Sequence, residues 1–592
     1  MTGDGLGPES DGLSTEQIAA LAPGIHLIEA GPGSGKTRTV VARFRQGTLD
    51  GRSVALLSFT NAAVDVAKSR CRDDPTLMEA PNFIGTFDQY FHRYVLTPDI
   101  RRRFGITPRY MSSWDDLPHH IALVRPSSGG SGIRLSCFAR EDEAWAVDEA
   151  RLNRSEEHFW NTLTPWRRSQ VNEEATKRIA GLHHSCIFDT TESRSRALHA
   201  LQEPDSIYLG RLKRRFGEII VDEFQDCDGV EHQLLGLLRS AGINVVAVAD
   251  PDQAIYEFRQ SSTGIYQQYR DSLAVTAIAS LTTCYRSTPA ICSLTSALRT
   301  VGLGELQPDP NHEGGASHIH VVVGSGVEAG SAALKLIRQQ GITARQTRVI
   351  AHRRSDARAL IRAGKQPPRG MSHMESLLVP VVELRSGVDA RGRLNSVKRI
   401  EAFILNQFDW PSDGTADTSD QQLKHLDLAP EHIRITASKL VSTSRFWSDK
   451  KACSAAVRAH LEELANDRPI NLAPRLGHRL VVPDKVWTFW ESQTEGLIPD
   501  IHLDAIRWAH VHSVKGAEFD GVVYAIPPKA TKNKHVLDDW EQEANSELRR
   551  VFYVGASRAG KMLVLVVPKT RHKQLTALLT STGVLHTITH VT

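Results

Sequence analysis

The chain has 592 residues, which is enough for about four domains of ordinary size. Hydrophobic residues make up 41%, charged residues 23%, and the formal charge is only +3, so the composition excludes a polybasic nucleic-acid binder. Residues 1–12 lack the basic and apolar regions of a signal peptide, and no apolar run is long enough for a membrane span. The seven cysteines are scattered and form no Cys-x-x-Cys pair. We expect a cytoplasmic protein with buried, reduced thiols and no membrane partner.

An apolar segment, residues 25–29, predicts a buried strand that leads into a glycine-rich loop. The loop reads Ala30-Gly31-Pro32-Gly33-Ser34-Gly35-Lys36-Thr37, and a helical segment is expected from Arg38. Strand, glycine loop and helix form the context of a phosphate-binding loop, because glycines let successive backbone N–H groups face an anion. We expect Lys36 to reach the β- and γ-phosphates of ATP and the Thr37 hydroxyl to bind Mg²⁺. Taken alone, the loop could also be an ordinary glycine turn.

A second apolar segment, residues 219–221, ends in two adjacent acids, Asp222 and Glu223. Open α/β sheets bind ligands at the carboxyl ends of their strands, so these acids are expected beside the loop. Asp222 would hold Mg²⁺, and Glu223 would orient and polarise the attacking water. An isolated acidic pair is usually a solvated strand end. The pair follows a phosphate loop here, and the combination predicts ATP hydrolysis.

Several segments resemble the motifs of UvrD/PcrA/Rep helicases of superfamily 1, in that family's order. Residues 222–226 read Asp-Glu-Phe-Gln-Asp and resemble motif II, which is more specific than a bare Asp-Glu pair. Residues 85–88 resemble the Gly-Thr-Phe-His element, with Asp88 in place of His. The other resemblances are to the Q motif at 13–17, motif Ia at 57–63, motif III at 249–259, motif IV at 285–288, motif V at 512–519 and motif VI at 553–559.

The resemblance implies an α/β fold of two RecA-like motor domains, 1A and 2A, with ATP between them and mainly helical insertions 1B and 2B. The expected boundaries are 1–88 and 215–279 for 1A, 89–214 for 1B, 280–365 and 500–592 for 2A, and 366–499 for 2B, which is short for the family. Basic runs at 101–103, 166–168 and 211–215 predict either solvated faces or a path for a DNA strand. Residues 563–567 are expected to be the last core strand, followed by a short tail without a nuclease domain.

The resemblance also implies roles for residues of the ATP site. Gln17 would read adenine, Tyr285 would stack on it, and Gln253 would sense the γ-phosphate. Arg286 and Arg558 match the family's arginine fingers, so the catalytic residues expected are Lys36, Glu223, Gln253, Arg286 and Arg558. The ATP-binding residues expected are Gln17, Ala30, Gly31, Pro32, Gly33, Ser34, Gly35, Lys36, Thr37, Arg38, Tyr285, Arg286, Gly516, Glu518 and Arg558. The metal ligands expected are Thr37 and Asp222.

Single-stranded DNA is bound without sequence preference through stacking faces and phosphate contacts. The stacking residues implied by the resemblance are Phe59, Tyr256 and Phe258. For Phe59 and Phe258 the alternative is core packing, which an aromatic ring serves equally well. The backbone contacts implied are Thr60, Asn61, Thr86 and His512.

The function implied is that of an ATP- and Mg²⁺-dependent 3′-to-5′ DNA helicase or translocase acting on single-stranded DNA and duplex junctions in DNA repair or replication restart. The alternative is a DNA-stimulated ATPase subunit that unwinds weakly alone and serves a nuclease partner in antiviral defence. The short 2B region, the short tail and the altered 2A element at residues 351–354 motivate this alternative, and the compact design resembles the helicase subunit of the Gabija antiphage system. An RNA motor or an inactive ATPase matches the motifs less well.

Overall fold

The computed structural model describes residues 12–117, 119–125, 132–141, 144–255, 263–301, 304–312, 314–361, 372–385, 390–409, 423, 427–466, 471–494, 507–529 and 534–591. Contacts divide the chain into two units. The first comprises residues 1–30 and 35–281, and the second comprises residues 31–34 and 282–592. Each unit is built around a six-stranded parallel sheet, which confirms the predicted α/β fold class.

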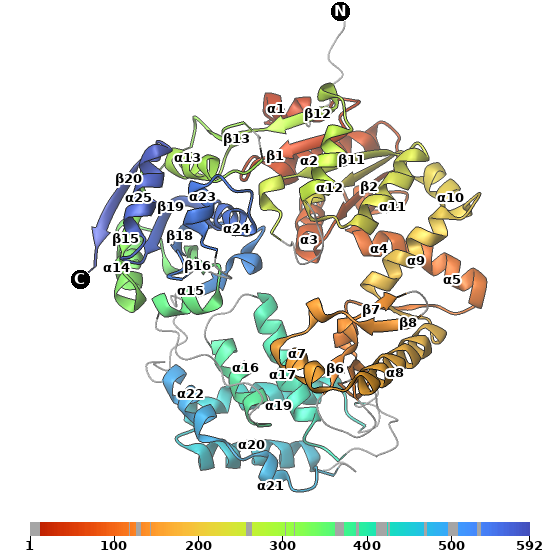
Figure 1. Ribbon diagram of the computed structural model, residues 1–592, viewed down its shortest axis with the longest axis vertical. Coiled ribbons are helices and arrows are strands. Elements are labelled where there is room, and N and C mark those ends of the chain that lie inside the picture. Colours follow the sequence, from red (N-terminus) through yellow and green to blue (C-terminus); the bar gives the residue numbers. More distant parts are fainter. Residues whose placement is uncertain are drawn as a thin grey trace, which may run out of the picture. The chain divides into compact units, whose positions relative to one another are not determined.

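The first unit contains a sheet of short strands (Figure 1). Its four inner strands are almost entirely buried, as expected for a parallel sheet covered on both faces. In spatial order the strands are β12 (Ile278–Leu281), β1 (Leu27–Ala30), β11 (Asn244–Ala249), β10 (Glu218–Val221), β2 (Val54–Ser58) and β3 (Phe83–Thr86). All neighbouring strands are parallel, so their carboxyl ends share one edge. The helices are α1 (Thr15–Ala19), α2 (Lys36–Leu49), α3 (Asn61–Arg70), α4 (Phe87–Phe91), α11 (Gly229–Ser240) and α12 (Thr263–Asp271).

Residues 89–214 combine helices with three small two-stranded sheets. The main helices are α5 (Thr97–Phe104), α7 (Arg154–Thr162), α8 (Pro165–His184), α9 (Thr190–Gln202) and α10 (Ile207–Arg215). The strand pairs are β4 (Arg109–Met111) with β9 (Ile187–Asp189), β5 (Leu123–Val124) with β6 (Ile133–Arg134), and β7 (Phe138–Glu141) with β8 (Ala144–Val147). In the basic run 101–103, Arg102 donates to the Tyr208 hydroxyl (3.0 Å) and Arg103 to Asp99 (2.8 Å). Part of this run therefore binds groups of its own unit.

The second unit has a sheet of six parallel strands (Figure 1). In spatial order the strands are β17 (Arg507–His510), β16 (Thr347–Ala351), β18 (Phe519–Ala525), β19 (Ala559–Val567), β15 (Ile319–Val323) and β20 (His586–His590). The prediction of a core strand at residues 563–567 is confirmed by the buried strand β19, but the segment after it is more than a short tail, because β20 pairs with β15 at the sheet edge. Its polar and largely exposed residues lack the apolar run that marks a core strand. Other elements are β13 (Thr283–Cys284), β14 (Gln307–Pro308), α13 (Pro289–Ala297), α14 (Gly326–Gln339), α15 (Arg354–Leu360), α23 (Val536–Glu541), α24 (Glu547–Ala556) and α25 (His572–Ser581).

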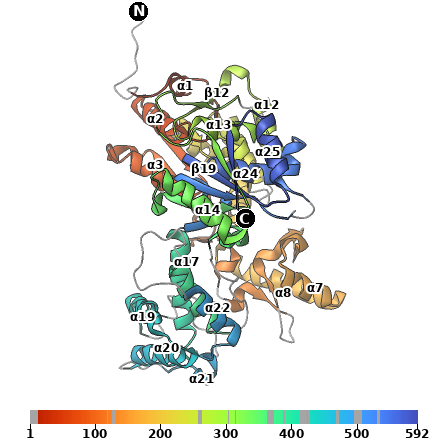
Figure 2. The same ribbon diagram turned by 90° about the vertical axis from the view of Figure 1, so that its left-hand side faces the viewer.

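A group of helices within residues 372–494 has a hydrophobic core of its own (Figure 2). The helices are α16 (Glu375–Arg385), α17 (Ala390–Leu405), α19 (Pro430–Thr443), α20 (Lys450–Ala465), α21 (Leu476–Arg479) and α22 (Asp484–Thr494). Three tryptophans pack together in this core, since the rings of Trp447 and Trp487 lie 5.3 Å and 6.3 Å from that of Trp490. This core depends on apolar residues of the 366–499 segment itself.

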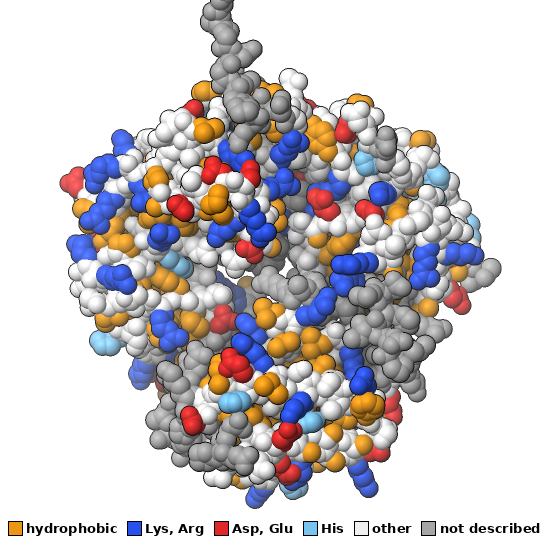
Figure 3. Space-filling model, turned by 180° about the vertical axis from the view of Figure 1, so that it is seen from behind, with side chains coloured by type: hydrophobic (Ala, Val, Ile, Leu, Met, Phe, Trp, Pro, Cys, Tyr) orange, Lys and Arg blue, Asp and Glu red, His pale blue; other side chains and the backbone are white. Residues whose placement is uncertain are grey.

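Lys and Arg side chains lie among acidic and apolar ones on the face drawn in Figure 3, as the small net charge predicts. All seven cysteines are buried free thiols, so that prediction is confirmed. In the part of the chain that the structure describes, no helix combines the length and apolar character of a membrane span.

Candidate ATP site and nucleic-acid face

Three segments expected at the ATP site follow three neighbouring strands of the first unit's parallel sheet. The glycine loop follows β1, Asp222 and Glu223 follow β10, and the segment 250–253 follows β11, which lies between them. Because these strands are parallel, all three segments leave the sheet at the same edge. The topology thus places the expected phosphate, metal and water residues of this unit at one site.

The glycine loop has the backbone conformation that a phosphate loop needs. Gly33 and Gly35 have φ values of 74° and 78°, in the left-handed region that glycine adopts without a Cβ clash. Gly35 is the N-cap of the 14-residue helix α2 and supplies no side-chain hydrogen bond, so the first-turn N–H groups receive no cap from it. Those N–H groups and the helix dipole favour an anion at this end of α2. Within the loop, the Ser34 hydroxyl donates to the Gly31 carbonyl (2.7 Å).

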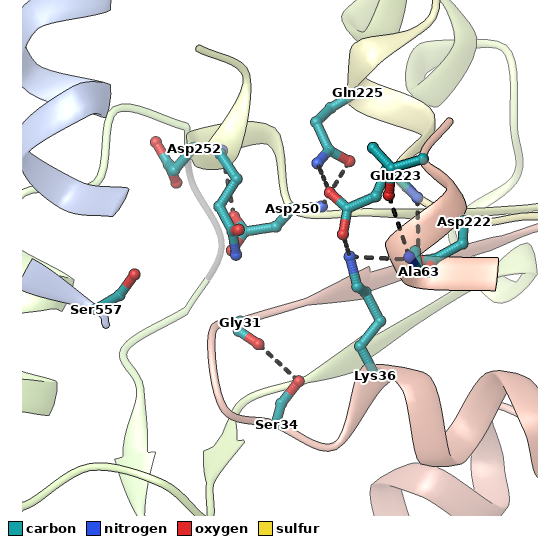
Figure 4. A network of polar contacts seen from close by, with 12 residues as sticks. Gly31, Ser34, Lys36, Ala63, Asp222, Glu223, Gln225, Asp250, Asp252 and Ser557 are labelled. Atoms are coloured by element: carbon teal, nitrogen blue, oxygen red, sulfur yellow. Dashed lines mark hydrogen bonds and ion pairs between the residues drawn. The ribbon is translucent and has the colours of Figure 1, made fainter. Parts of the chain in front are cut away.

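Lys36, the first residue of α2, points toward the two acids that follow β10 (Figure 4). Its ammonium group donates a short hydrogen bond to Glu223 and lies 3.3 Å from an Asp222 carboxylate oxygen. Burial alone would lower the pKa of Lys36, but the carboxylates of Asp222 and Glu223 raise it well above its usual value. Lys36 is therefore a fixed positive charge, mostly buried, at the end of the sheet.

Glu223 is held in an uncommon backbone conformation. Its φ of 58° lies in the left-handed region, which costs a non-glycine residue about 1–3 kcal/mol and is found mainly at functional sites. Its N–H donates to the Asp222 carboxylate (3.0 Å), and its own carboxylate accepts from Gln225 Nε2 (2.6 Å). These contacts aim the Glu223 carboxylate at Lys36.

A chain of hydrogen bonds joins Glu223 to Gln253. Gln225 donates to Glu223, and its amide oxygen accepts from the N–H of Asp250 (3.1 Å). The Asp250 carboxylate accepts from Gln253 Nε2 (2.7 Å). Neither Gln225 nor Asp250 was among the expected site residues, although both lie in segments that resemble family motifs. Only the pairing of β10 with β11 reveals that they link the expected catalytic pair.

The first unit also offers suitable ligands for Mg²⁺. Thr37 follows Lys36 in α2, and Asp222 lies beside Lys36. Mg²⁺ prefers hard oxygen ligands and is commonly bound by one or two protein oxygens together with phosphates and water. The described residues contain no cluster of three or more acidic, His or Cys ligands, as expected when the nucleotide completes the coordination. The Thr37 hydroxyl and the Asp222 carboxylate therefore fit a metal that arrives with ATP.

The expected arginine fingers lie in the second unit, close to its motif V residues. Arg286 forms an ion pair with Glu518 and donates to the Ser557 carbonyl (3.0 Å). Arg558 is 2% exposed and donates to the carbonyls of Val554 (3.0 Å) and Ala517 (3.3 Å). Arg286 thus pairs with a residue that is expected to bind nucleotide, whereas Arg558 also ties α24 to the segment before β18.

Replacing Arg558 with Ala is expected to lower the free energy of unfolding by about 3 kcal/mol, because a buried side chain is lost together with its hydrogen bonds to the Val554 and Ala517 carbonyls. Replacing Arg286 with Ala should lower it by less than about 1 kcal/mol, since its carboxylate partner is largely exposed. Denaturant unfolding of the two variants and the parent measures both values. Equal losses would contradict the different packing of the two arginines.

The other expected ATP residues have varied surroundings. Gln17 is buried, and its amide oxygen accepts from the Ser14 N–H (3.1 Å) in a capping box at the start of α1. Ala30 is buried at the end of β1, and Arg38 is exposed on α2. Tyr285 is 39% exposed, so its ring is accessible to a stacking partner.

Four expected DNA contacts lie at the carboxyl ends of β2 and β3, the two strands next to β10 at one edge of the first sheet. Phe59, Thr60 and Asn61 follow β2, and Thr86 ends β3, where Ser58 and Thr86 are register partners. The Phe59 ring stacks on Phe87, with centroids 5.5 Å apart, so one of its faces already serves packing. The Thr60 and Thr86 hydroxyls cap α3 and α4. These residues form a cluster beside the expected ATP residues.

The other expected DNA contacts do not join this cluster. Tyr256 and Phe258 lie outside the described residues. His512 is in the second unit, with its ring 6.2 Å from that of His352. Asp88, which replaces the family's His, accepts from Arg194 Nε (2.7 Å). This substitution therefore comes with a specific ion pair to α9 within the first unit.

Comparison with known proteins identifies the family. The UvrD/REP helicase N-terminal domain matches residues 13–274, and the UvrD-like helicase C-terminal domain matches residues 491–570. The ATP-dependent DNA helicase UvrD2 of Mycobacterium tuberculosis (strain ATCC 25618 / H37Rv) is 23% identical over 593 residues, which cover 94% of this chain and 78% of UvrD2.

Shorter matches have slightly higher identity. YjcD of Bacillus subtilis (strain 168) is 28% identical over 304 residues, covering 48% of this chain and 38% of YjcD. DNA helicase II of Escherichia coli (strain K12) is 27% identical over 300 residues, covering 49% of this chain and 40% of that protein. The chain thus matches less than half the length of these two relatives. The two domain matches, to residues 13–274 and 491–570, together cover more than half of the chain, and the chain belongs to the UvrD/Rep helicase family.

Proposed function

We propose that this chain is an ATP-dependent motor that moves along single-stranded DNA in the 3′-to-5′ direction and opens duplex at junctions. One observation carries the proposal: Lys36 contacts Asp222 and Glu223 at the edge of a parallel sheet, and hydrogen bonds extend from Glu223 to Gln253. Lys36 is a cation suited to binding phosphates, and Glu223 is a carboxylate suited to orienting water. The hydrogen bonds connect Glu223 to Gln253 in motif III.

The proposed chemistry is in-line attack of water on the γ-phosphorus of ATP, which breaks the bond to the β–γ bridging oxygen and yields ADP and inorganic phosphate. Lys36 is released from the carboxylates to bind the β- and γ-phosphates, and the N–H groups of the glycine loop bind the remaining oxygens. Glu223 orients the water and accepts its proton, with Gln225 holding the carboxylate. Thr37 and Asp222 would hold Mg²⁺, which would supply positive charge to offset that of the phosphates. Arg286 and Arg558 match the family's arginine fingers, and the role proposed for them is to stabilise the charge of the transition state.

Coupling to DNA is proposed to run through the sheet edge. Phe59 and Thr60 follow β2, Thr86 is the last residue of β3, and Asp222 follows β10, which pairs with β2. Single-stranded DNA would stack on Phe59 and place phosphates against the neighbouring hydroxyl and amide groups. A shift of β2 against β10 would then reach the carboxylates that act on ATP.

Single-stranded DNA is expected to stimulate ATP hydrolysis, and Phe59→Ala should raise the DNA concentration for half-maximal stimulation about tenfold. Loss of one stacked base costs about 1–3 kcal/mol, which corresponds to this factor. Phe59→Tyr keeps the stacking face and should restore parental behaviour. The measurement is phosphate release against DNA concentration for all three proteins. Hydrolysis that is indifferent to DNA in the parent protein would overturn the proposed motor function.

The direction of movement needs a separate test. Duplexes with a single-stranded tail at either the 3′ or the 5′ end are mixed with the protein and ATP. Preferential displacement on the 3′-tailed duplex is the expected result. Preferential displacement on the 5′-tailed duplex would reverse the proposed polarity while leaving the motor function intact.

The second candidate function is a DNA-stimulated ATPase that serves a nuclease partner in antiphage defence. The 366–499 segment supports it, because this segment is short for the family and forms its own compact helical core. Purification of the tagged chain from its native host, followed by a nuclease assay of the eluate, tests the idea. A copurifying nuclease together with weak unwinding by the isolated chain would favour this role over independent unwinding.

A further inference from the structure

Glu29 is a buried carboxylate in the strand that leads into the phosphate loop. It is 2% exposed and lies in β1, which has a neighbouring strand on either side. A buried carboxylate is costly unless it is paired and hydrogen-bonded. A hydrophobic residue would be less costly at this buried position. The hydrogen-bond partners of Glu29 therefore indicate what the carboxylate does there.

Both partners of Glu29 come from one face of α12. The Tyr266 hydroxyl donates to the Glu29 carboxylate (2.5 Å), and Arg270 Nε donates to the same oxygen (2.7 Å). The two donors are four residues apart, so they project from the same side of the helix. The Tyr269 hydroxyl also donates to the carbonyl of His26, just before β1 (3.3 Å). Together these bonds fix α12 against the strand before the phosphate loop.

The same helix contacts motif II. The Tyr269 ring packs on Phe224, with centroids 4.7 Å apart and planes inclined by 49°. Phe224 directly follows Glu223, whose left-handed backbone needs support from its surroundings. Helix α12 therefore contacts both the strand before the loop that carries Lys36 and the segment that carries Glu223.

We propose that Glu29 is a positioning residue for ATP hydrolysis: through Tyr266 and Arg270 it holds α12 against β1, and α12 in turn holds Phe224 and the neighbouring Glu223 in place. The proposal rests on the hydrolytic function proposed above. Glu29 itself touches no reacting group. Its effect is on where the Glu223 carboxylate lies, so its loss should reduce turnover more than ATP binding.

The central variant is Glu29→Gln, which keeps an acceptor for Tyr266 but removes the charge that pairs with Arg270. We expect the DNA-stimulated kcat to fall about tenfold, because small misplacements of a catalytic group are costly, while the KM for ATP stays within about twofold. Arg270→Gln should have a similar effect. The double variant should lose no more than either single variant, since both remove one interaction.

Glu173→Gln is the matched control, because it breaks the exposed ion pair with Lys177 on α8. It should leave kcat unchanged. Thermal unfolding of every variant identifies changes that come only from a smaller folded fraction. A parental kcat in folded Glu29→Gln, or additive losses in the double variant, would overturn the positioning role.

A second readout does not need ATP turnover. Amide hydrogen exchange in a peptide spanning residues 222–228 is expected to be several-fold faster in Glu29→Gln than in the parent, with peptides of the second sheet unchanged. Unchanged exchange at 222–228 would reject the proposal. If the parent hydrolyses no ATP but exchange responds as expected, the proposed function fails and the contact between Glu29, α12 and motif II stands.

Discussion

Replacement of Lys36 by Ala is expected to reduce ATP hydrolysis at least about 1,000-fold, both with and without DNA. The change removes the cation that would bind the phosphates, and it leaves Asp222 and Glu223 adjacent without a positive charge between them. Like charges so close repel each other and an incoming nucleotide. Phosphate release at saturating ATP and DNA measures the loss.

Two further variants test whether the loss is specific to position 36 and to the ammonium group. Lys335→Ala removes an exposed lysine of α14 and should behave as the parent protein. Lys36→Arg keeps the charge but replaces a compact ammonium by a planar guanidinium, so we expect it to remain strongly impaired. Hydrolysis by Lys36→Ala within tenfold of the parent would show that this loop is not the phosphate site.

The second large effect is expected for Glu223→Gln, which preserves the shape of the side chain and removes its basicity. Turnover should fall by about 100- to 10,000-fold, the usual contribution of a general base. ATP binding should persist, because Lys36 and the glycine loop remain and one carboxylate charge is removed from the phosphate site. Single-turnover hydrolysis and titration with a fluorescent ATP analogue separate the two effects.

The control is Glu157→Gln on the exposed surface of α7, which should change neither quantity. If Glu223→Gln instead weakened ATP binding as strongly as turnover, Glu223 would act in assembling the site rather than in activating water. Nearly parental turnover in Glu223→Gln would show that another group acts as the base.

Some features of this protein follow from local sequence alone. The glycine loop between an apolar strand and a helix is predictable because positive φ favours glycine at defined positions, as Gly33 and Gly35 show. The acids at 222 and 223 are predictable because a parallel strand ends where ligands bind. The order of the motifs likewise indicates the helicase family, which the family matches confirm.

Other features depend on contacts between residues that are distant in the sequence. The bonds from Gln225 to Asp250 and from Glu29 to α12 exist only because strands and helices are brought together in one unit. The strand β20 has a polar sequence and becomes a strand by pairing with β15.

Local sequence thus determined the kinds of chemical group at the ATP site, because backbone conformation and strand ends depend on neighbouring residues. Tertiary structure decided which side chains hold those groups in place. A supporting partner such as Tyr266 for Glu29 leaves no local pattern, since its role arises from distance in space and from the cost of burying an unpaired charge.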